Sequence, residues 1–221
     1  SYMDLPGCYY LPDKKIDPEQ PESIRNIQKA LYQDQIDVWV NVVDVKYLAQ
    51  QLMLTLTLIE QKRRVILVLN QADTMNKVGL EVDINKLASI LNIPVLSISA
   101  KFGTGVTALQ DAVKSMIQGQ QQDSDYILRY PPPLESLIQA QIQETPENNR
   151  FDALTILIGK TTQDKLPAFM LQEGFEALLR GCQYGLVEFI SQVKRAQARD
   201  LSRACSKKVS KSDKQFSKTL D

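Results

Sequence analysis

Apolar and polar positions follow two different patterns between about residue 21 and residue 118. Some stretches place large apolar residues three and four positions apart, which indicates amphipathic helices, whereas short runs rich in valine and isoleucine indicate buried strands. The expected helices begin near Pro21, Leu48, Ile84 and Thr104, with Thr104 as the cap of the last one, and the expected strands cover 38–43, 65–69 and 95–98. This alternation predicts a parallel sheet with crossover helices, and therefore an α/β fold.

The composition changes after Gly119, where Gln, Asp and Ser dominate and three consecutive prolines follow at 131–133. Because neither a helix nor a sheet accepts such a run readily, it predicts a linker. Beyond it, apolar residues keep helical spacing without alternating with strands, which predicts a small all-α domain. The resulting division is a first domain at 1–119, a linker at 120–133, a helical domain at 134–205 and a basic tail at 206–221.

Charge and composition exclude several functions. The chain has 26 basic and 26 acidic residues, so no net field attracts it to nucleic acid. It has no histidine, and its three cysteines, Cys8, Cys182 and Cys205, lie far apart, which excludes the usual zinc ligand sets and histidine-based catalysis. The longest apolar runs, such as 65–69, are far too short to cross a bilayer, and no signal peptide is visible. We expect a soluble chain in a reducing cytoplasm.

Three short motifs carry the candidate chemistry. They are Asp4-Leu5-Pro6-Gly7, Asn70-Gln71-Ala72-Asp73 and Ser99-Ala100-Lys101. Each alone is common turn chemistry, but the last two follow predicted buried strands, and ligands of open α/β sheets bind at the carboxyl ends of strands. In this order and spacing, the set predicts a GTP-binding domain.

Guanine explains the two later motifs. An Asp73 carboxylate can accept from the N1–H and the exocyclic amine of the base, while Asn70 can pair with the ring edge and brace the neighbouring loops. The backbone amides of Ala100 and Lys101 can donate to the guanine O6. Adenine inverts this pattern of donors and acceptors, so the motifs predict a preference for guanine.

The phosphate side of the site is only partly present. Asp4 would hold Mg²⁺ through water, and the Gly7 amide would reach the γ-phosphate, at a position where glycine allows close approach. The loop G-x-x-x-x-G-K-[ST], which holds the phosphates, is not found before Asp4. A circularly permuted loop at Gly159-Lys160-Thr161 is disfavoured, because Leu154 stands where its first glycine belongs; the alternative is a helix over about 151–158 that Gly159 ends.

These motifs and their surroundings resemble the cytosolic region of FeoB, a family of bacterial ferrous iron transporters. The resemblance rests on Asp4 to Leu11, the strand Asn41-Val42-Val43-Asp44, the leucine run from Leu52 to Glu60, and the N-x-x-D motif with Gln71 in place of the usual lysine. It covers almost the whole chain. It implies a Ras-like P-loop GTPase sheet, with its amino-terminal strands missing from this chain, followed by a helical coupling domain that leads to membrane helices.

The family also implies GTP or GDP and Mg²⁺ as ligands, with Asp4 and Gly7 sensing the γ-phosphate, Asn70 and Asp73 reading guanine, and Ser99 and Ala100 bracing the base. It assigns no catalytic residue that is present here, so we do not expect hydrolysis by this chain alone. We expect about 50 further residues at the amino end to supply the phosphate loop. Without them the strand at 38–43 would expose an apolar edge.

The function predicted first is therefore a regulatory guanine-nucleotide-binding domain, whose slow GTP hydrolysis is coupled to iron uptake at the cytoplasmic face of the bacterial inner membrane. Its partners would be the nucleotide and the membrane-embedded region of the same protein, with no nucleic acid. Self-association into a homo-oligomer stays open. The alternatives are a non-catalytic scaffold and a GTPase of ribosome assembly or RNA modification, the latter disfavoured by the zero net charge.

Overall fold

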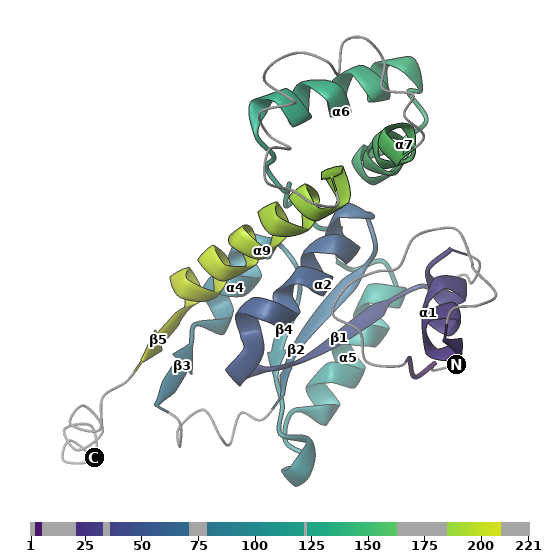
Figure 1. Ribbon diagram of the computed structural model, residues 1–221. Coiled ribbons are helices and arrows are strands. Elements are labelled where there is room, and N and C mark those ends of the chain that lie inside the picture. Colours follow the sequence, from purple (N-terminus) through teal and green to yellow (C-terminus); the bar gives the residue numbers. More distant parts are fainter. Residues whose placement is uncertain are drawn as a thin grey trace. The chain divides into compact units, whose positions relative to one another are not determined.

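The computed structural model describes residues 3–5, 21–32, 36–70, 79–121, 123–162 and 185–208 (Figure 1). Its contacts divide the chain into two compact units. The first consists of residues 1–126 together with 198–221, and the second of residues 127–197. The domain boundaries expected from the sequence remain a prediction, and each unit is described by itself below.

A three-stranded parallel sheet forms the centre of the first unit. Its strands are β1 (Trp39–Asp44), β2 (Val65–Asn70) and β4 (Val95–Ser97), in the order β1-β2-β4. The first five residues of β2 are all buried, as befits the middle strand of a sheet covered on both faces. The predicted α/β fold with a parallel sheet is confirmed, with strand ends that differ from the expected ones by one residue.

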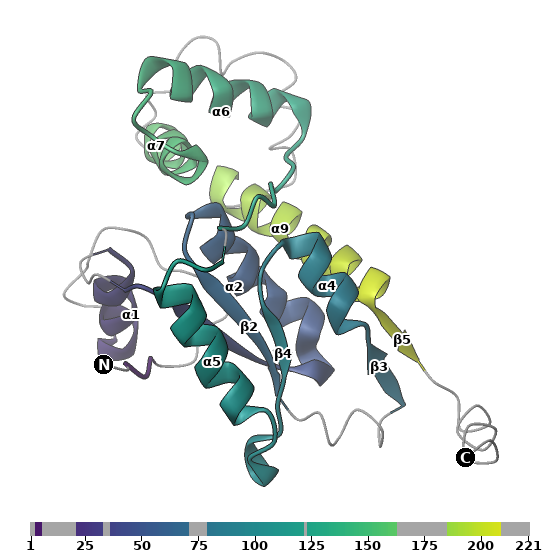
Figure 2. The ribbon, with the colours of Figure 1, turned by 180° about the vertical axis from the view of Figure 1, so that it is seen from behind.

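Helices lie on both faces of this sheet (Figures 1 and 2). On one face α2 (Leu48–Glu60) packs on β1 and β2 and buries Leu52 and Leu56 completely. A hydrogen bond of 2.8 Å from Asn41 Nδ2 to Thr55 Oγ1 ties β1 to this helix. On the other face, α5 (Val106–Ile117) contributes Met116 to a core cluster. Its other buried members are Ile66, Val68 and Ile98.

Two further helices complete the described part of this unit outside α9. The helix α1 (Glu22–Tyr32) begins directly after Pro21, as predicted, and buries Ile27 and Ala30. The helix α4 (Ile84–Leu91) packs against β4.

Strand β1 is at the edge of the described sheet, and two of its valine side chains are exposed to solvent. Val40 and Val42 are 40% and 53% exposed, whereas Trp39, Asn41 and Val43, which alternate with them, are buried. The alternation arises because successive side chains of a strand point to opposite faces, and only the face toward α2 is covered along β1. In the described residues β1 is thus a terminal strand of the sheet with two exposed valines on one face.

Two helix boundaries differ from the prediction. The helix α5 begins at Val106 with Gly105 as its cap, because Thr104 instead forms a bridge with Ser99. The helix α7 (Arg150–Thr162) does not end at Gly159 but continues through it. Glycine costs a helix only about 1 kcal/mol relative to alanine, so neighbouring residues can carry the helix past it. A helix through 159–162 also excludes a permuted phosphate loop there.

A second, small sheet was not predicted. It consists of β3 (Leu80–Val82) and β5 (Ser206–Lys208), which pair in antiparallel orientation. The strand β5 directly follows α9 (Gly185–Cys205), whose residues belong to the second unit up to Gln197 and to the first unit from Ala198 onward. Ser206, Lys207 and Lys208, the first three residues of the stretch predicted as a basic tail, form this strand.

The second unit contains α6 (Pro132–Glu144), α7 and the first part of α9. The helix α6 starts inside the proline run that the sequence indicated as linker, with Pro131 as its cap. Proline is compatible with the first helical turn because the amide it lacks would have no partner there. Among the described residues, no helix combines the length and the apolar character that crossing a membrane requires.

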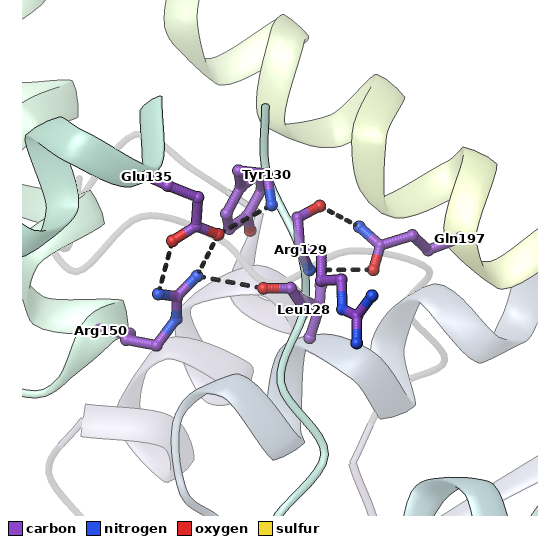
Figure 3. A network of polar contacts seen from close by, with 6 residues as sticks. All are labelled: Leu128, Arg129, Tyr130, Glu135, Arg150 and Gln197. Carbon is purple, nitrogen blue, oxygen red and sulfur yellow. Dashed lines mark hydrogen bonds and ion pairs between the residues drawn. The ribbon is translucent and has the colours of Figure 1, made fainter. Parts of the chain in front are cut away.

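An arginine binds the extended segment before α6 to the helices (Figure 3). Arg150 on α7 forms two bonds of 2.8 Å to the Glu135 carboxylate on α6, and it also donates to the Leu128 carbonyl at 3.0 Å. The Tyr130 amide donates to the same carboxylate at 2.9 Å. The Arg150 guanidinium thus joins three parts of the second unit, which are α6, α7 and the extended segment that precedes α6.

A side-chain amide of α9 adds a second attachment of the same segment (Figure 3). Gln197 Nε2 donates to the Arg129 carbonyl at 2.8 Å, and Gln197 Oε1 accepts from the Arg129 amide at 3.1 Å. The pair of bonds imitates the contact of a strand partner and satisfies both backbone groups of Arg129.

The ion pair at Glu135 predicts a loss of stability in acid. Burial alone would raise the pKa of Glu135, but the Arg150 hydrogen bond, the Tyr130 amide and the Arg150 charge together hold the pKa below its ordinary value of 4.5. A carboxyl group with a lowered pKa in the folded state stabilises the protein above its unfolded pKa, and this contribution is lost as the pH falls through the folded pKa. Urea unfolding should therefore show a difference in free energy of unfolding between wild type and Glu135→Gln that shrinks as the pH falls below 4.5. A difference that stays constant from neutral pH into this range would contradict the assignment.

Candidate functional site

The parallel strands of the first unit bring polar residues together at one edge of the sheet. β1 ends at Asp44 and β2 at Asn70, and these two residues are direct partners in the register of the ladder. The neighbouring strand β4 ends at Ser97, two residues before Ser99. Three carboxyl ends of parallel strands therefore meet here, which is the edge where open α/β sheets bind ligands.

A side-chain hydrogen bond joins two of the predicted motifs. Asn70 Oδ1 accepts from the Ala100 amide at 3.3 Å, so residues 30 positions apart in the chain meet at the site. This is the bracing contact expected of Asn70. The Ala100 amide donates to Asn70 in this structure, and its expected donation to the guanine O6 stays a prediction.

The loop from Ser99 to Gly105 is closed by its own backbone. The Ser99 amide donates to the Thr104 carbonyl at 3.0 Å, and the Phe102 amide donates to the Ser99 carbonyl at 3.1 Å. Ser99 is buried at the base of the loop, while Ala100 and Lys101 lie exposed in a short 3₁₀ turn, η2 (Ala100–Phe102). The loop therefore exposes two predicted site residues to solvent, while backbone hydrogen bonds hold its conformation.

The exposed side of this loop carries a cation next to an aromatic ring. Lys101 Nζ lies 5.3 Å from the centroid of the Phe102 ring, which is within the range of a cation–π contact. Phe102 itself is 64% exposed. The contact orients the Lys101 side chain along the loop without burying it.

Two residues at this edge were not singled out from the sequence. Asp44 Oδ1 accepts from the Lys46 amide at 2.9 Å and so caps the short turn η1 (Val45–Tyr47), while Gln51 Oε1 accepts from the Asp44 amide at 2.5 Å. The carboxyl end of β1 is thus held rigidly beside Asn70. A sequence signal existed in the aspartate that ends an apolar run, since aspartate is a preferred cap.

Of the other candidate site residues, one is described without the rest of its motif, and three lie outside the described residues. Asp4 is described only with Met3 and Leu5, and it is exposed. Gly7, Gln71 and Asp73 lie outside the described residues. Their roles stay predictions.

The described residues contain no group of three or more Asp, Glu, His or Cys side chains that could hold a metal ion. Mg²⁺ at a nucleotide site usually takes one or two carboxylates and completes its shell with water and phosphate oxygens. A single carboxylate such as Asp4 fits that pattern, so the magnesium assignment also stays a prediction.

Comparison with known proteins gives the family. Residues 1–113 match the family model of ferrous iron transport protein B. The Fe(2+) transporter FeoB of Staphylococcus aureus strain COL is 27% identical over 166 residues, which is 75% of this chain and 22% of that protein. The Fe(2+) transporter FeoB of Legionella pneumophila strain Lens is 34% identical over 110 residues, or 50% of this chain and 14% of that protein. The chain thus spans about a fifth of these relatives or less.

Solved structures agree on the fold. The cytosolic domain of the T. maritima FeoB iron transporter, in a GDP form, superimposes with a TM-score of 0.74 at 24% identity, over 92% of this chain and 79% of that chain. The cytosolic domain of L. pneumophila FeoB gives a TM-score of 0.66 at 20% identity, over 93% of this chain and 77% of that chain. With more than half of its residues matched by the family model, this chain belongs to the ferrous iron transport protein B family.

Proposed function

We propose that this chain is the guanine-nucleotide-binding regulatory domain of a bacterial ferrous iron transporter, and that GTP binding and slow hydrolysis are coupled to iron uptake through the membrane part. The observation that carries this proposal is the bond between Asn70 and Ala100, because it joins the two predicted base-recognition motifs at the ligand-binding edge of the sheet. Relatives of the same fold were solved with GDP and with GMPPNP, which supports guanine nucleotides as the ligand class.

In this proposal the base lies over the carboxyl ends of β2 and β4. Asp73 accepts from the two donors of the guanine edge, and Asn70 holds the loop after β4 at a fixed distance. The Lys101 amide donates to the guanine O6, and the contact of the Lys101 side chain with Phe102 keeps that side chain along the loop. A carboxylate that faced adenine would lose both hydrogen bonds and remain partly desolvated, which gives the selectivity its physical basis.

The phosphates extend from the base toward the Asp4 motif. Asp4 would hold Mg²⁺ through water, and the Gly7 amide would donate to the γ-phosphate of GTP. Loss of that phosphate on hydrolysis would remove the partner of the Gly7 amide, which is the proposed signal of the nucleotide state. Mg²⁺ would supply charge neutralisation of the phosphates, and the residues of this chain would orient it.

The helical residues after the first domain are proposed to pass this change to the membrane-embedded region of the same protein. The protein would then work at the cytoplasmic face of the inner membrane, and the basic residues near its carboxyl end suit the cytoplasmic side of a bilayer. Membership in the transporter family disfavours a role in ribosome assembly or RNA modification.

A titration with fluorescently labelled GDP, repeated with labelled ATP, tests the proposal. We expect GDP to bind with a dissociation constant in the micromolar range and ATP to bind much more weakly. A folded sample that binds neither nucleotide would instead favour the non-catalytic scaffold. Circular dichroism on the same sample establishes that it is folded.

Replacing Asn70 should weaken guanine binding. In Asn70→Ala the Ala100 amide loses its acceptor and the loop after β4 loses its brace, so the dissociation constant for GDP should rise about tenfold, the size expected for one or two hydrogen bonds. The same titration measures it. Asn85→Ala is the matched control, because Asn85 is an exposed residue of α4, and it should leave GDP affinity unchanged. Equal affinities of the two variants would refute the role of Asn70.

A further inference from the structure

The carboxyl-terminal strand β5 is attached to the part of the chain that links the two base-recognition motifs. In chain order, Asn70 ends β2, residues 71–78 follow, and β3, α4 and β4 then lead to Ser99 and Ala100. Among the described residues, the ladder partner of β3 is β5. We propose that β5 is a positioning element for guanine recognition, which holds the connector β3–α4–β4 and thereby adds to the β2–β4 pairing in keeping the Ala100 loop against Asn70. The proposal rests on the proposed function, since it concerns the same site.

The attachment is a regular antiparallel ladder with an added backbone bond. Val82 pairs with Ser206 and Glu81 with Lys207. The ladder is closed by the Asp83 amide, which donates to the Cys205 carbonyl at 2.7 Å. The Glu81 and Lys207 pair also places opposite charges directly across the ladder, which favours this register over a shifted one.

Burial at the junction of α9 and β5 supports the attachment. Ala198, Leu201 and Cys205 are spaced three and four positions apart and form a buried stripe on the end of α9. Cys205 is only 2% exposed, and burial raises the pKa of its thiol, so the side chain remains neutral in an apolar setting. In both ribbon views this end of α9 runs beside α4 (Figures 1 and 2). The helix therefore delivers β5 to β3 from a fixed direction.

The connector transmits this constraint to the site through α4. Asp83, whose amide is bonded to Cys205, also caps α4, because its Oδ1 accepts from the Lys86 amide at 2.9 Å. At the other end of the helix, the Leu91 carbonyl accepts from the Ser124 hydroxyl at 2.6 Å. Leu87 is fully buried, and α4 packs on β4, the strand that leads to Ser99.

The connector is fixed at both ends of α4, and one of those ends depends on β5. Without β5, the start of α4 would keep its aspartate cap but lose its backbone attachment. The segment after Asn70 would then join a strand without a partner in the described chain. β2 and β4 would stay paired from Leu67–Val95 to Leu69–Ser97, so the loosening would act beyond the ends of these strands, on the loop that carries Ala100. Because binding free energies are reciprocal, guanine nucleotide should in turn stabilise the β3–β5 ladder.

A proline in β5 tests the inference in the full 221-residue chain. Lys207→Pro removes the backbone amide of the central ladder residue and leaves the main sheet untouched. We expect amide hydrogen exchange to become at least about tenfold faster at Glu81 and Asp83, and also at Ala100, whose amide is bonded to Asn70. The dissociation constant for labelled GDP should rise about fivefold. Lys207→Arg keeps both the backbone amide and the positive charge opposite Glu81, serves as the matched control, and should change neither quantity.

The outcomes separate this inference from the proposed function. Faster exchange at Ala100 together with weaker GDP binding in Lys207→Pro alone supports the positioning role. Faster exchange confined to β3 and β5, with Ala100 and GDP affinity unchanged, overturns it. If the wild-type chain binds no guanine nucleotide, the proposed function fails, and exchange at Ala100 in the absence of nucleotide still decides whether β5 holds the connector.

Discussion

Gly105→Ala should lower the free energy of unfolding by about 3 kcal/mol, which is among the larger effects of a single substitution. Gly105 has a φ of +83°, in the left-handed region, where a residue with a Cβ atom costs about 1–2 kcal/mol. A Cβ atom there would also lie 2.6 Å from the Ser97 carbonyl oxygen and 3.0 Å from Ile98 Cγ2. Neither neighbour can move easily, because Ser97 belongs to β4 and Ile98 to the buried cluster under α5.

The same loop offers a matched control. Gly103 also has a positive φ, +67°, but a Cβ atom there would have no neighbour within 4 Å. Gly103→Ala should therefore lower the free energy of unfolding by only about 1 kcal/mol, which is the cost of placing alanine in the left-handed region. Urea unfolding followed by circular dichroism measures both variants, and equal losses would show that the close approach to β4 is unimportant. GDP affinity should fall in Gly105→Ala beyond the effect of Gly103→Ala, because displacement of the loop moves Ala100 away from Asn70.

Arg150→Met should destabilise the second unit by about 2 kcal/mol. Removing one partner of a buried ion pair costs about 3–5 kcal/mol, and we reduce this figure because the side chains of Arg150 and Glu135 are 18% and 29% exposed. The substitution leaves the Glu135 carboxylate without its cation and the Leu128 carbonyl without that donor. Methionine retains much of the aliphatic volume, so the loss reports the polar contacts rather than a cavity.

An exposed ion pair in the first unit serves as the comparison. Arg64 Nε lies 3.3 Å from Asp123 Oδ1, with side chains 43% and 61% exposed. Arg64→Met should therefore cost less than about 0.5 kcal/mol, as is usual for a surface pair. Thermal unfolding monitored by calorimetry compares the two variants, and the assignment of Arg150 as the stronger anchor is wrong if their losses are equal. The double variant Arg150→Met with Glu135→Leu should recover part of the loss, because it removes the unpaired carboxylate as well.

The main sheet could be predicted because burial on both faces leaves a strong pattern. The run at 65–69 is apolar throughout, and a strand between two layers of helices requires that composition. The strands β3 and β5 could not be found in this way. Each has three residues, and their pairing depends on where a 21-residue helix ends, which local patterns do not encode.

Helix ends were the least predictable part of the fold. The prolines at 132 and 133 and the glycine at 159 were interpreted as breakers, but two of them lie in a first turn and one lies inside a helix. Their effect depends on position within the helix and on packing around it, and periodicity alone reports neither.

At the candidate site, the sequence predicted that Asn70 braces the neighbouring loops, and the structure bonds it to the Ala100 amide. The roles of the site residues toward a nucleotide stay predictions. The importance of Gly105 for stability could not be predicted, because it comes from the short distance to the Ser97 carbonyl oxygen, which the sequence does not show. The bond between Gln51 and Asp44 was missed for a similar reason, since the glutamine lies on a helix that looks simply amphipathic.

The division of the chain has a consequence for topology. Because the first unit includes residues on both sides of 127–197, the second unit is an insertion within the first, and it is tethered by a covalent link at each end. Cutting the chain at the end of α5, where a conventional domain would stop, removes a strand of the first unit along with the insertion. A version of the first unit by itself would instead omit 127–197 and rejoin the flanking residues through a short flexible linker, preserving the native partner of β3.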